Sequence, residues 1–131
     1  MKLTDKPVSN FLDELASNAP APGGGSVAAL SGALGAALIS MVCNLTLGKK
    51  AYAYVQGDIE ALLEQSEALR AKLTGLLDED VKAYTGYSKA AKMPRATDEE
   101  KAERAVAMQA ALKVATDVPL SIAETAVEVM D

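Results

Sequence analysis

The sequence predicts an all-α protein built as a bundle of long helices. Half of its 131 residues are hydrophobic but only 4% are aromatic, and alanine is abundant whereas β-branched residues are few. This composition favours closely packed helices over a sheet. A break rich in proline and glycine falls at 18–25 and a second break, around Pro94, at 92–97, and apolar residues recur at helical spacing between and after them. The length suits one core, so we expect residues 1–131 to form a single helical domain.

Two helices are expected before residue 50. A short one should follow Ser9, a favourable N-cap, and four apolar residues lie on one of its faces: Val8, Phe11, Leu12 and Leu15. The second should begin at Ser26, another favourable N-cap, and stop near Gly48, which suits the position just past a helix end. Lys49 and Lys50 would then lie beside the negative end of its dipole.

Two longer helices should follow. The first is expected from about Asp58 to Lys89, where apolar residues recur every three to four positions. Thr97 and Glu100 then form a predicted capping box at the start of the last helix, which Pro119 should kink or end. Because the last residues keep helical spacing without a stop signal, we expect the domain to be truncated at its C-terminal end.

The segment 26–47 carries no charged residue over twenty-two positions, which is long enough to span a membrane. Much of it is Ala, Gly and Ser, Asn44 and Thr46 sit near one end, and no aromatic belt flanks it. We therefore expect a buried helix of a soluble protein and no membrane contact. Small residues at four-residue spacing let a neighbouring backbone approach closely, so this helix should lie at the centre of the bundle or of a subunit interface.

Composition also excludes several classes of function. The net charge of −5 argues against nucleic acid as a partner. The absence of histidine excludes His-dependent catalysis and His-containing zinc sites, and we expect no metal. Cys43 is the sole cysteine and is expected in the core. The first seventeen residues lack the apolar region of a signal peptide, so the expected location is the cytoplasm.

The glycine run before the second helix is a candidate binding element. Gly23, Gly24, Gly25 and Ser26 would expose backbone N–H groups at a helix N-terminus, which suits an anion or the polar edge of a heterocycle. The run matches neither a phosphate-binding loop nor a dinucleotide-binding fingerprint. On composition alone, a flexible turn between two helices explains it better.

Asp80 is the most informative charged residue. At 100° per residue it falls within the apolar stripe of the third predicted helix, one turn after Leu76 and Leu77 and one turn before Tyr84. An unpaired carboxylate there must pair, take up a proton or line a cavity. Burial would raise its pKa, which suits general acid/base chemistry. A structural ion pair with Lys49, Lys50 or an arginine is the alternative.

Four segments resemble the formiminotransferase-cyclodeaminase C-terminal domain family in the same order: "APGGGSVAALSGALGAALISMVCNLTLGKKAY", "LLDEDVKAYTGY", "KMPRATDEEKAERAVAMQAALKVA" and "VPLSIAETAVEV". The resemblance implies an all-helical homodimer that binds folate in a cleft near the subunit interface. It also implies one of two activities on the carbon that joins N5 and N10 of tetrahydrofolate. These are methenyltetrahydrofolate cyclohydrolase, which the absence of a formiminotransferase domain favours, and formimidoyltetrahydrofolate cyclodeaminase.

The resemblance also suggests roles for individual residues. The family's functional aspartate matches Asp78 or Asp80, and the apolar stripe favours Asp80 as the general acid/base. The remaining expected contacts with substrate come from the glycine run and from the end of the same helix: Gly23, Gly24, Gly25 and Ser26 frame the pocket, Asn44 orients the pterin or the one-carbon unit, and Lys49 or Lys50 meets the glutamate tail. No metal or organic cofactor is expected. The competing class is a non-catalytic helical protein that binds folate or a partner helix.

Overall fold

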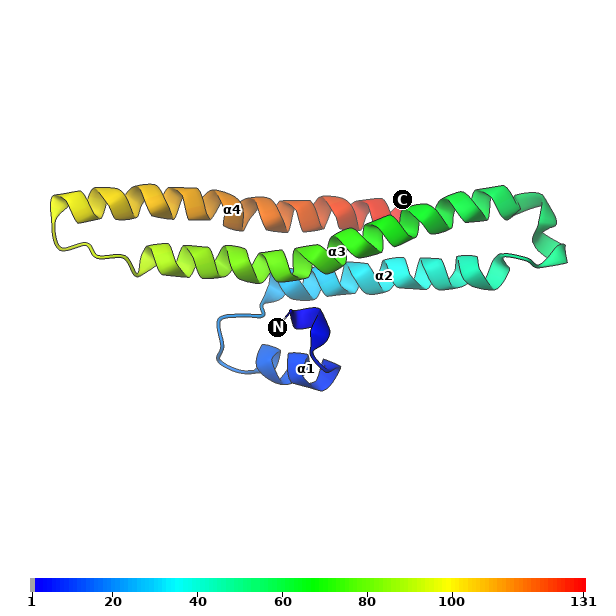
Figure 1. Cartoon of the computed structure of the whole chain (residues 1–131), viewed down its shortest axis with the longest axis horizontal. Helices are drawn as coiled ribbons and strands as arrows, with labels where there is room; N and C mark the ends of the chain where they lie inside the picture. The colour runs from blue at the N-terminus through cyan, green and yellow to red at the C-terminus, as the bar shows by residue number, and fades with distance from the viewer. Residues whose placement is uncertain (1) are drawn as a thin grey trace.

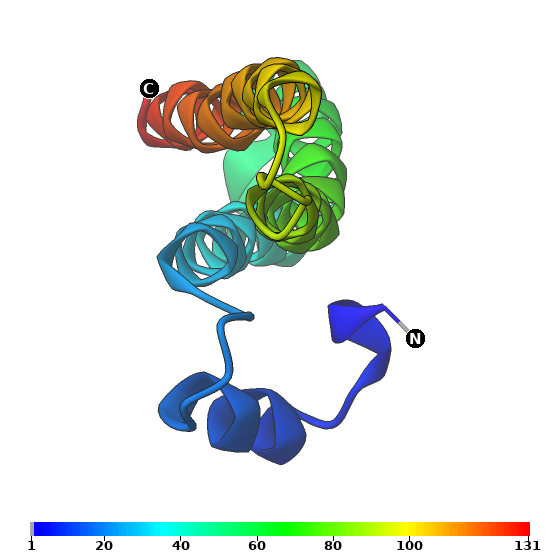
Figure 2. The ribbon, with the colours of Figure 1, turned by 90° about the vertical axis from the view of Figure 1, so that its left-hand side faces the viewer.

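The computed structural model describes residues 2–131, and these residues form helices and no strand. The elements in order are the 3-10 helix η1 (Leu3–Asp5), α1 (Val8–Ala16), α2 (Gly24–Thr46), the 3-10 helix η2 (Lys50–Val55), α3 (Gln56–Ala91) and α4 (Asp98–Met130). The predicted all-α class is therefore confirmed. In Figure 1 the three long helices run side by side, and α1 with the N-terminal turn lies below α2. The end-on view in Figure 2 shows the same separation of α1 from the long helices.

The core lies where α3 packs against both α2 and α4. It contains small residues from α2 and large ones from the other two helices: Ala29, Ala33, Leu73, Leu76, Leu77 and Ile122. Gly32 packs so closely on α3 that a Cβ added to it would lie 3.0 Å from Leu73 Cδ1. The small-residue face of α2 is thus buried as predicted, because it lets the α3 backbone approach.

The opposite face of α2 is not covered within the described residues. Its large apolar side chains are about half exposed: Leu34, Leu38, Met41, Val42 and Leu45. We call these five residues the α2 stripe. By length and composition α2 and α4 could each cross a bilayer, although core helices of soluble proteins pass the same test. We predicted that α2 lies at the centre of the bundle or of a subunit interface. Residues 2–131 do not surround it on all sides, so the first of these two predictions is not met.

Two predicted helix starts are wrong. The N-cap of α1 is Pro7, so Ser9 lies inside the helix, and the N-cap of α2 is Gly23 with no side-chain cap. Ser26 is fully buried, and its Oγ donates a hydrogen bond to the Leu77 carbonyl oxygen of α3 at 2.9 Å. The bond to α3 replaces the capping role that the sequence suggested. At the other end of α2, Gly48 has a φ of +78°, as its predicted position past the helix end requires.

The two long C-terminal helices follow the prediction closely. The expected helix from Asp58 to Lys89 corresponds to α3, and the Thr97–Glu100 capping box is present, with Glu100 N donating to Thr97 Oγ1 at 3.1 Å. The prediction was wrong where it allowed Pro119 to end the last helix, since α4 continues to Met130. Val118 and Ile122 pack into the core on either side of Pro119, and this packing holds the helix together.

Candidate active site

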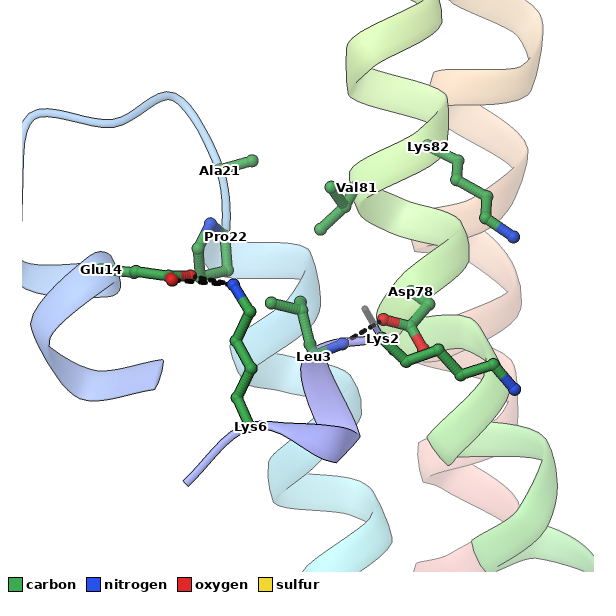
Figure 3. A pocket seen from close by; sticks show the side chains of 9 residues that line it. All are labelled: Lys2, Leu3, Lys6, Glu14, Ala21, Pro22, Asp78, Val81 and Lys82. Carbon is green, nitrogen blue, oxygen red and sulfur yellow. Dashed lines mark hydrogen bonds and ion pairs between the residues drawn. The ribbon is translucent and has the colours of Figure 1, made fainter. Parts of the chain in front are cut away.

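Asp78 and Asp80 occupy different environments although they are two residues apart on α3. Asp78 Oδ1 accepts a hydrogen bond from the Leu3 backbone N–H at 2.8 Å, which fastens the N-terminal turn to α3 (Figure 3). Asp80 is half-buried and lines a cleft on another side of the helix. Within residues 2–131, no group donates a hydrogen bond to its carboxylate and no cation pairs with it. The ion pair considered from the sequence is therefore not formed.

The cleft around Asp80 has a volume of about 280 Å³. Four elements meet in it: the linker before α2, the N-terminus of α2, the middle of α3 and the middle of α4. Its lining residues are Pro20, Ala21, Gly23, Gly24, Gly25, Asp80, Val81, Ala83, Tyr84 and Ala115. The structure thus places the predicted glycines and the predicted carboxylate, which are far apart in sequence, around one cavity.

Gly25 is the closest α2 neighbour of the Asp80 carboxylate. A Cβ added at Gly25 would collide with Asp80 Oδ1, Cγ and Oδ2, whereas one added at Gly23 or Gly24 would meet no atom within 4 Å. Gly25 therefore has a steric role that the other two glycines lack. The absence of a side chain at this one position lets the carboxylate lie against the first turn of α2.

The first turn of α2 also supplies free hydrogen-bond donors. The first bond within the helix runs from Val27 N to Gly23 O, at 3.1 Å. The N–H groups of Gly24, Gly25 and Ser26 therefore have no acceptor inside the helix. Gly24 and Gly25 line the cleft, but the Ser26 hydroxyl points away toward Leu77. The positive end of the α2 dipole favours a negative charge here.

Three predicted site residues lie at the far end of α2. Asn44 is twenty residues beyond Gly24 along the helix, which corresponds to about 30 Å at 1.5 Å per residue. Lys49 and Lys50 lie further on, at the start of η2, and all three residues are exposed. Within one chain they do not come together with Asp80 around a single small ligand.

Other lysines lie closer to Asp80. A neighbouring cavity of about 400 Å³ is lined by Lys2, Leu3, Lys6, Glu14, Ala21, Pro22, Asp78, Val81 and Lys82, and it shares Ala21 and Val81 with the Asp80 cleft. In Figure 3 the side chains of these two shared residues point toward each other. Lys6 pairs with Glu14 at 2.7 Å, whereas no acid within residues 2–131 pairs with Lys2 or Lys82. No sequence pattern joins these lysines, because the N-terminal turn and α3 meet only in the fold.

A second carboxylate of α3, that of Glu67, is fully engaged. It accepts hydrogen bonds from Arg70 Nε at 2.6 Å, Arg70 Nη2 at 2.9 Å and Ser40 Oγ at 3.0 Å. The Arg70 hydrogen bonds, and then the Ser40 bond, hold the pKa of Glu67 below its ordinary value of 4.5. Glu67 thus reaches Ser40 of α2 from α3, so its role is to join two helices.

The remaining chemistry-bearing side chains are not gathered into a site. Cys43 is 1% exposed, which agrees with its predicted place in the core. Within residues 2–131 no three His, Cys, Asp or Glu side chains are grouped so that they could hold a metal ion. Five apolar cleft residues were missed as site residues because their side chains carry no chemical signal: Pro20, Ala21, Val81, Ala83 and Ala115. Tyr84 entered the sequence argument only as an apolar-stripe residue one turn after Asp80, and its place in the cleft was not predicted.

The fold and the cleft define the class of this protein: an all-helical domain with a carboxylate beside a glycine-lined helix N-terminus. Comparison with known proteins then defines the family. The family model described as formiminotransferase-cyclodeaminase matches residues 7–131, so this chain belongs to that family. It is 56% identical over 124 residues to the methenyltetrahydrofolate cyclohydrolase of Methylorubrum extorquens, covering 95% of this chain and 60% of that protein. It is 44% identical over 123 residues to the formimidoyltransferase-cyclodeaminase of Sus scrofa, covering 94% of this chain and 23% of that protein.

The fold is shared with a solved structure as well. The crystal structure of formiminotetrahydrofolate cyclodeaminase from Thermotoga maritima superimposes with a TM-score of 0.78 at 33% sequence identity, over 95% of this chain and 58% of that one. The chain therefore spans about three fifths of the length of these single-activity relatives.

Proposed function

We propose that this protein hydrolyses 5,10-methenyltetrahydrofolate to 10-formyltetrahydrofolate, with Asp80 as the general acid/base. The observation that carries the proposal is the contact between Asp80 and Gly25 in the cleft. It leaves the carboxylate oxygens free for a ligand, in a chain 56% identical to a methenyltetrahydrofolate cyclohydrolase. The positive end of the α2 dipole and the free N–H groups of its first turn lie beside this carboxylate and suit a negatively charged group.

The chemistry follows from one carboxylate that first accepts and then returns a proton. Water attacks the cationic methenyl carbon while Asp80 takes a proton from the water, which gives a neutral hydroxyl adduct. The bond from that carbon to N5 then breaks, and Asp80 returns its proton to N5. The hydroxyl oxygen becomes the formyl carbonyl on N10, and its proton leaves to solvent, so one proton is released overall. The negative Asp80 also stabilises the cationic substrate. This route requires neither a metal nor an organic cofactor.

The cleft suggests how the substrate lies. Gly24 and Gly25 supply N–H donors for the polar edge of the pterin, and Tyr84, 43% exposed at the rim, supplies a ring for stacking. The glutamate tail carries carboxylates and would extend into the neighbouring cavity, toward Lys2 and Lys82. This places the tail at different lysines from the pair near residue 50 that the sequence suggested.

The related reaction uses the same groups. In a cyclodeaminase, N10 attacks the carbon of the protonated formimino group, Asp80 carries the N10 proton to the leaving nitrogen, and ammonia departs to leave the methenyl cation. The test is to supply the full-length protein with methenyltetrahydrofolate and, separately, with 5-formiminotetrahydrofolate. We expect faster loss of methenyl absorbance in the first assay and no ammonia above background in the second. Ammonia release with no accelerated hydrolysis would overturn the cyclohydrolase assignment in favour of the deaminase.

A binding protein without catalysis is the remaining alternative. It predicts that tetrahydrofolate binds while methenyltetrahydrofolate decays at its rate in buffer. The same two assays, with a binding titration added, separate it from both enzymes. A folate enzyme of this kind would act in the cytoplasm.

We also propose that the α2 stripe is the surface through which two copies of this chain associate. Leu34, Leu38, Met41 and Leu45 repeat at alternating spacings of four and three, which is the seam spacing of paired helices. No charge lies between residues 26 and 47 to oppose a second α2. Leu38→Glu should turn a dimer into a monomer by light scattering, whereas Val106→Glu, at an exposed apolar residue of α4 outside the stripe, should not. If the wild type is a monomer and Leu38→Glu still lowers its stability against unfolding, further residues of the same polypeptide cover the stripe instead.

A further inference from the structure

The interior of α4 contains a proline that has no structural benefit of its own. Pro119 is exposed and lies between Asp98 and Met130, where α4 continues without a break. Proline has no N–H, so it cannot donate to the carbonyl four residues earlier, and its ring crowds that carbonyl. In α4 that carbonyl belongs to Ala115, which therefore lacks the donor that a helix normally provides.

The residue that carries this carbonyl, Ala115, lines the Asp80 cleft. Ala115 is the residue through which α4 lines the cleft, facing the glycine run and Asp80. Val118 and Ile122, which pack into the core around the proline, keep this stretch of α4 fixed against α3. The fold thus tolerates a broken helical hydrogen bond at the turn of α4 that borders the cleft.

We infer that the Ala115 backbone carbonyl accepts a hydrogen bond from an N–H group of the ligand, and that Pro119 is the positioning residue that keeps this carbonyl free. The inference rests on the proposed function. One wall of the cleft then offers donors, the N–H groups of Gly24 and Gly25, and the other offers acceptors, Asp80 and the Ala115 carbonyl. The pyrimidinone edge of a pterin carries both kinds of group, an oxygen at C4 and N–H donors at N3 and the 2-amino group. A ring without N–H donors on that edge would leave the Ala115 carbonyl unused.

The test is Pro119→Ala, which restores the N–H that a helix would give to the Ala115 carbonyl. We expect the KM for methenyltetrahydrofolate to rise about tenfold, as for one lost hydrogen bond, with kcat changed less than about twofold. The unfolding temperature should rise, because alanine replaces proline inside a helix. If Pro119 served only the structure of the helix, Pro119→Ala would not make the protein more stable and at the same time weaken binding.

Asp117→Ala is the matched control. Asp117 is exposed, lies two residues before Pro119 and points to the opposite side of α4, about 160° from Ala115. Alanine there also raises helix propensity but adds no N–H for the Ala115 carbonyl. We expect higher stability and an unchanged KM. If Asp117→Ala weakens binding as much as Pro119→Ala does, the stiffness of α4 is responsible and the inference is wrong.

A second measurement changes the ligand instead of the protein. A tetrahydrofolate analogue methylated at N3 and lacking the 2-amino group should bind wild-type protein at least about tenfold more weakly than tetrahydrofolate. Pro119→Ala should bind both compounds with more nearly equal affinity. A wild-type enzyme with normal turnover and an unchanged KM in Pro119→Ala overturns this inference alone. A wild-type protein that neither binds tetrahydrofolate nor accelerates hydrolysis overturns the proposed function first.

Discussion

Glu67 and Asp80 are two carboxylates of α3 that both meet α2, and their surroundings differ. Glu67 meets a serine hydroxyl and an arginine, and both of its oxygens accept hydrogen bonds. Asp80 meets a glycine, and no group within residues 2–131 donates to it. A carboxylate whose hydrogen bonds are made inside the protein joins helices, whereas one left free in a cleft can act on a ligand. Four sets of substitutions would test this distinction.

The largest expected effect comes from Asp80→Asn. Removing the proton-transferring group should lower kcat by about 10²- to 10⁴-fold while tetrahydrofolate still binds. Methenyl absorbance measures the rate and a fluorescence titration measures binding. Asp78→Asn is the matched control, because the amide oxygen can still accept from Leu3 N–H. Loss of turnover in Asp78→Asn with normal turnover in Asp80→Asn would reverse the assignment.

Gly25→Ala should have the next largest effect. The new methyl group would collide with the Asp80 carboxylate and force it to move, and a shift of about 1 Å at a catalytic group can cost about 100-fold in rate. Gly75→Ala, on α3 and outside the cleft, has open space for its methyl group, so it should keep full activity and gain about 0.5–1 kcal/mol of helix stability. Equal activities in the two variants would show that Gly25 does not position Asp80.

Lysine substitutions should change binding rather than chemistry. Replacing Lys2 and Lys82 together by alanine should raise KM several-fold and weaken its dependence on salt, because two cations near the tail are lost. The double alanine variant of Lys49 and Lys50 should leave KM unchanged, since these residues lie at the other end of α2. A higher KM in the second variant would mean that the cleft is completed by another copy of the chain.

The smallest effect should come from Glu67, and it should depend on pH. Because the folded-state pKa of Glu67 is lowered, its contribution to stability is present above the ordinary value of 4.5 and is lost as pH falls through the folded value. Glu67→Gln should therefore lower the urea midpoint slightly at about pH 6, and the difference from wild type should shrink at about pH 3. Turnover near neutral pH should not change. A large loss of turnover would remove the distinction between the two carboxylates.

Much of the fold could be predicted from local patterns. The spacing of apolar residues placed α3, the Thr97–Glu100 pair placed the start of α4, and the small residues of α2 identified its buried face. The errors came from contacts between helices. Ser26 resembles an N-cap, but its hydroxyl bonds to α3, and Pro119 resembles a helix end, but packing on both sides of it holds α4 together.

The candidate site was only partly predictable for the same reason. Asp80 could be recognised as a candidate from the sequence, because a charge in an apolar stripe needs an explanation. The glycines could be recognised because they precede a helix. Asn44, Lys49 and Lys50 were joined to them through the family resemblance, and a helix of 23 residues separates the two groups. Ala115 lines the cleft, but its methyl side chain carries no chemical signal in the sequence.

The contact between Gly25 and Asp80 makes the effect of one substitution depend on the residue at the other position. In the wild-type background Gly25→Ala is expected to be harmful, because the methyl group and the carboxylate need the same space. Once Asp80 is shortened to alanine, that space is empty and the same change should stabilise α2, as alanine does in any helix. The two positions therefore show sign epistasis. A lineage that lost the carboxylate could accumulate side chains at position 25, and regaining Asp80 would first require the glycine to return.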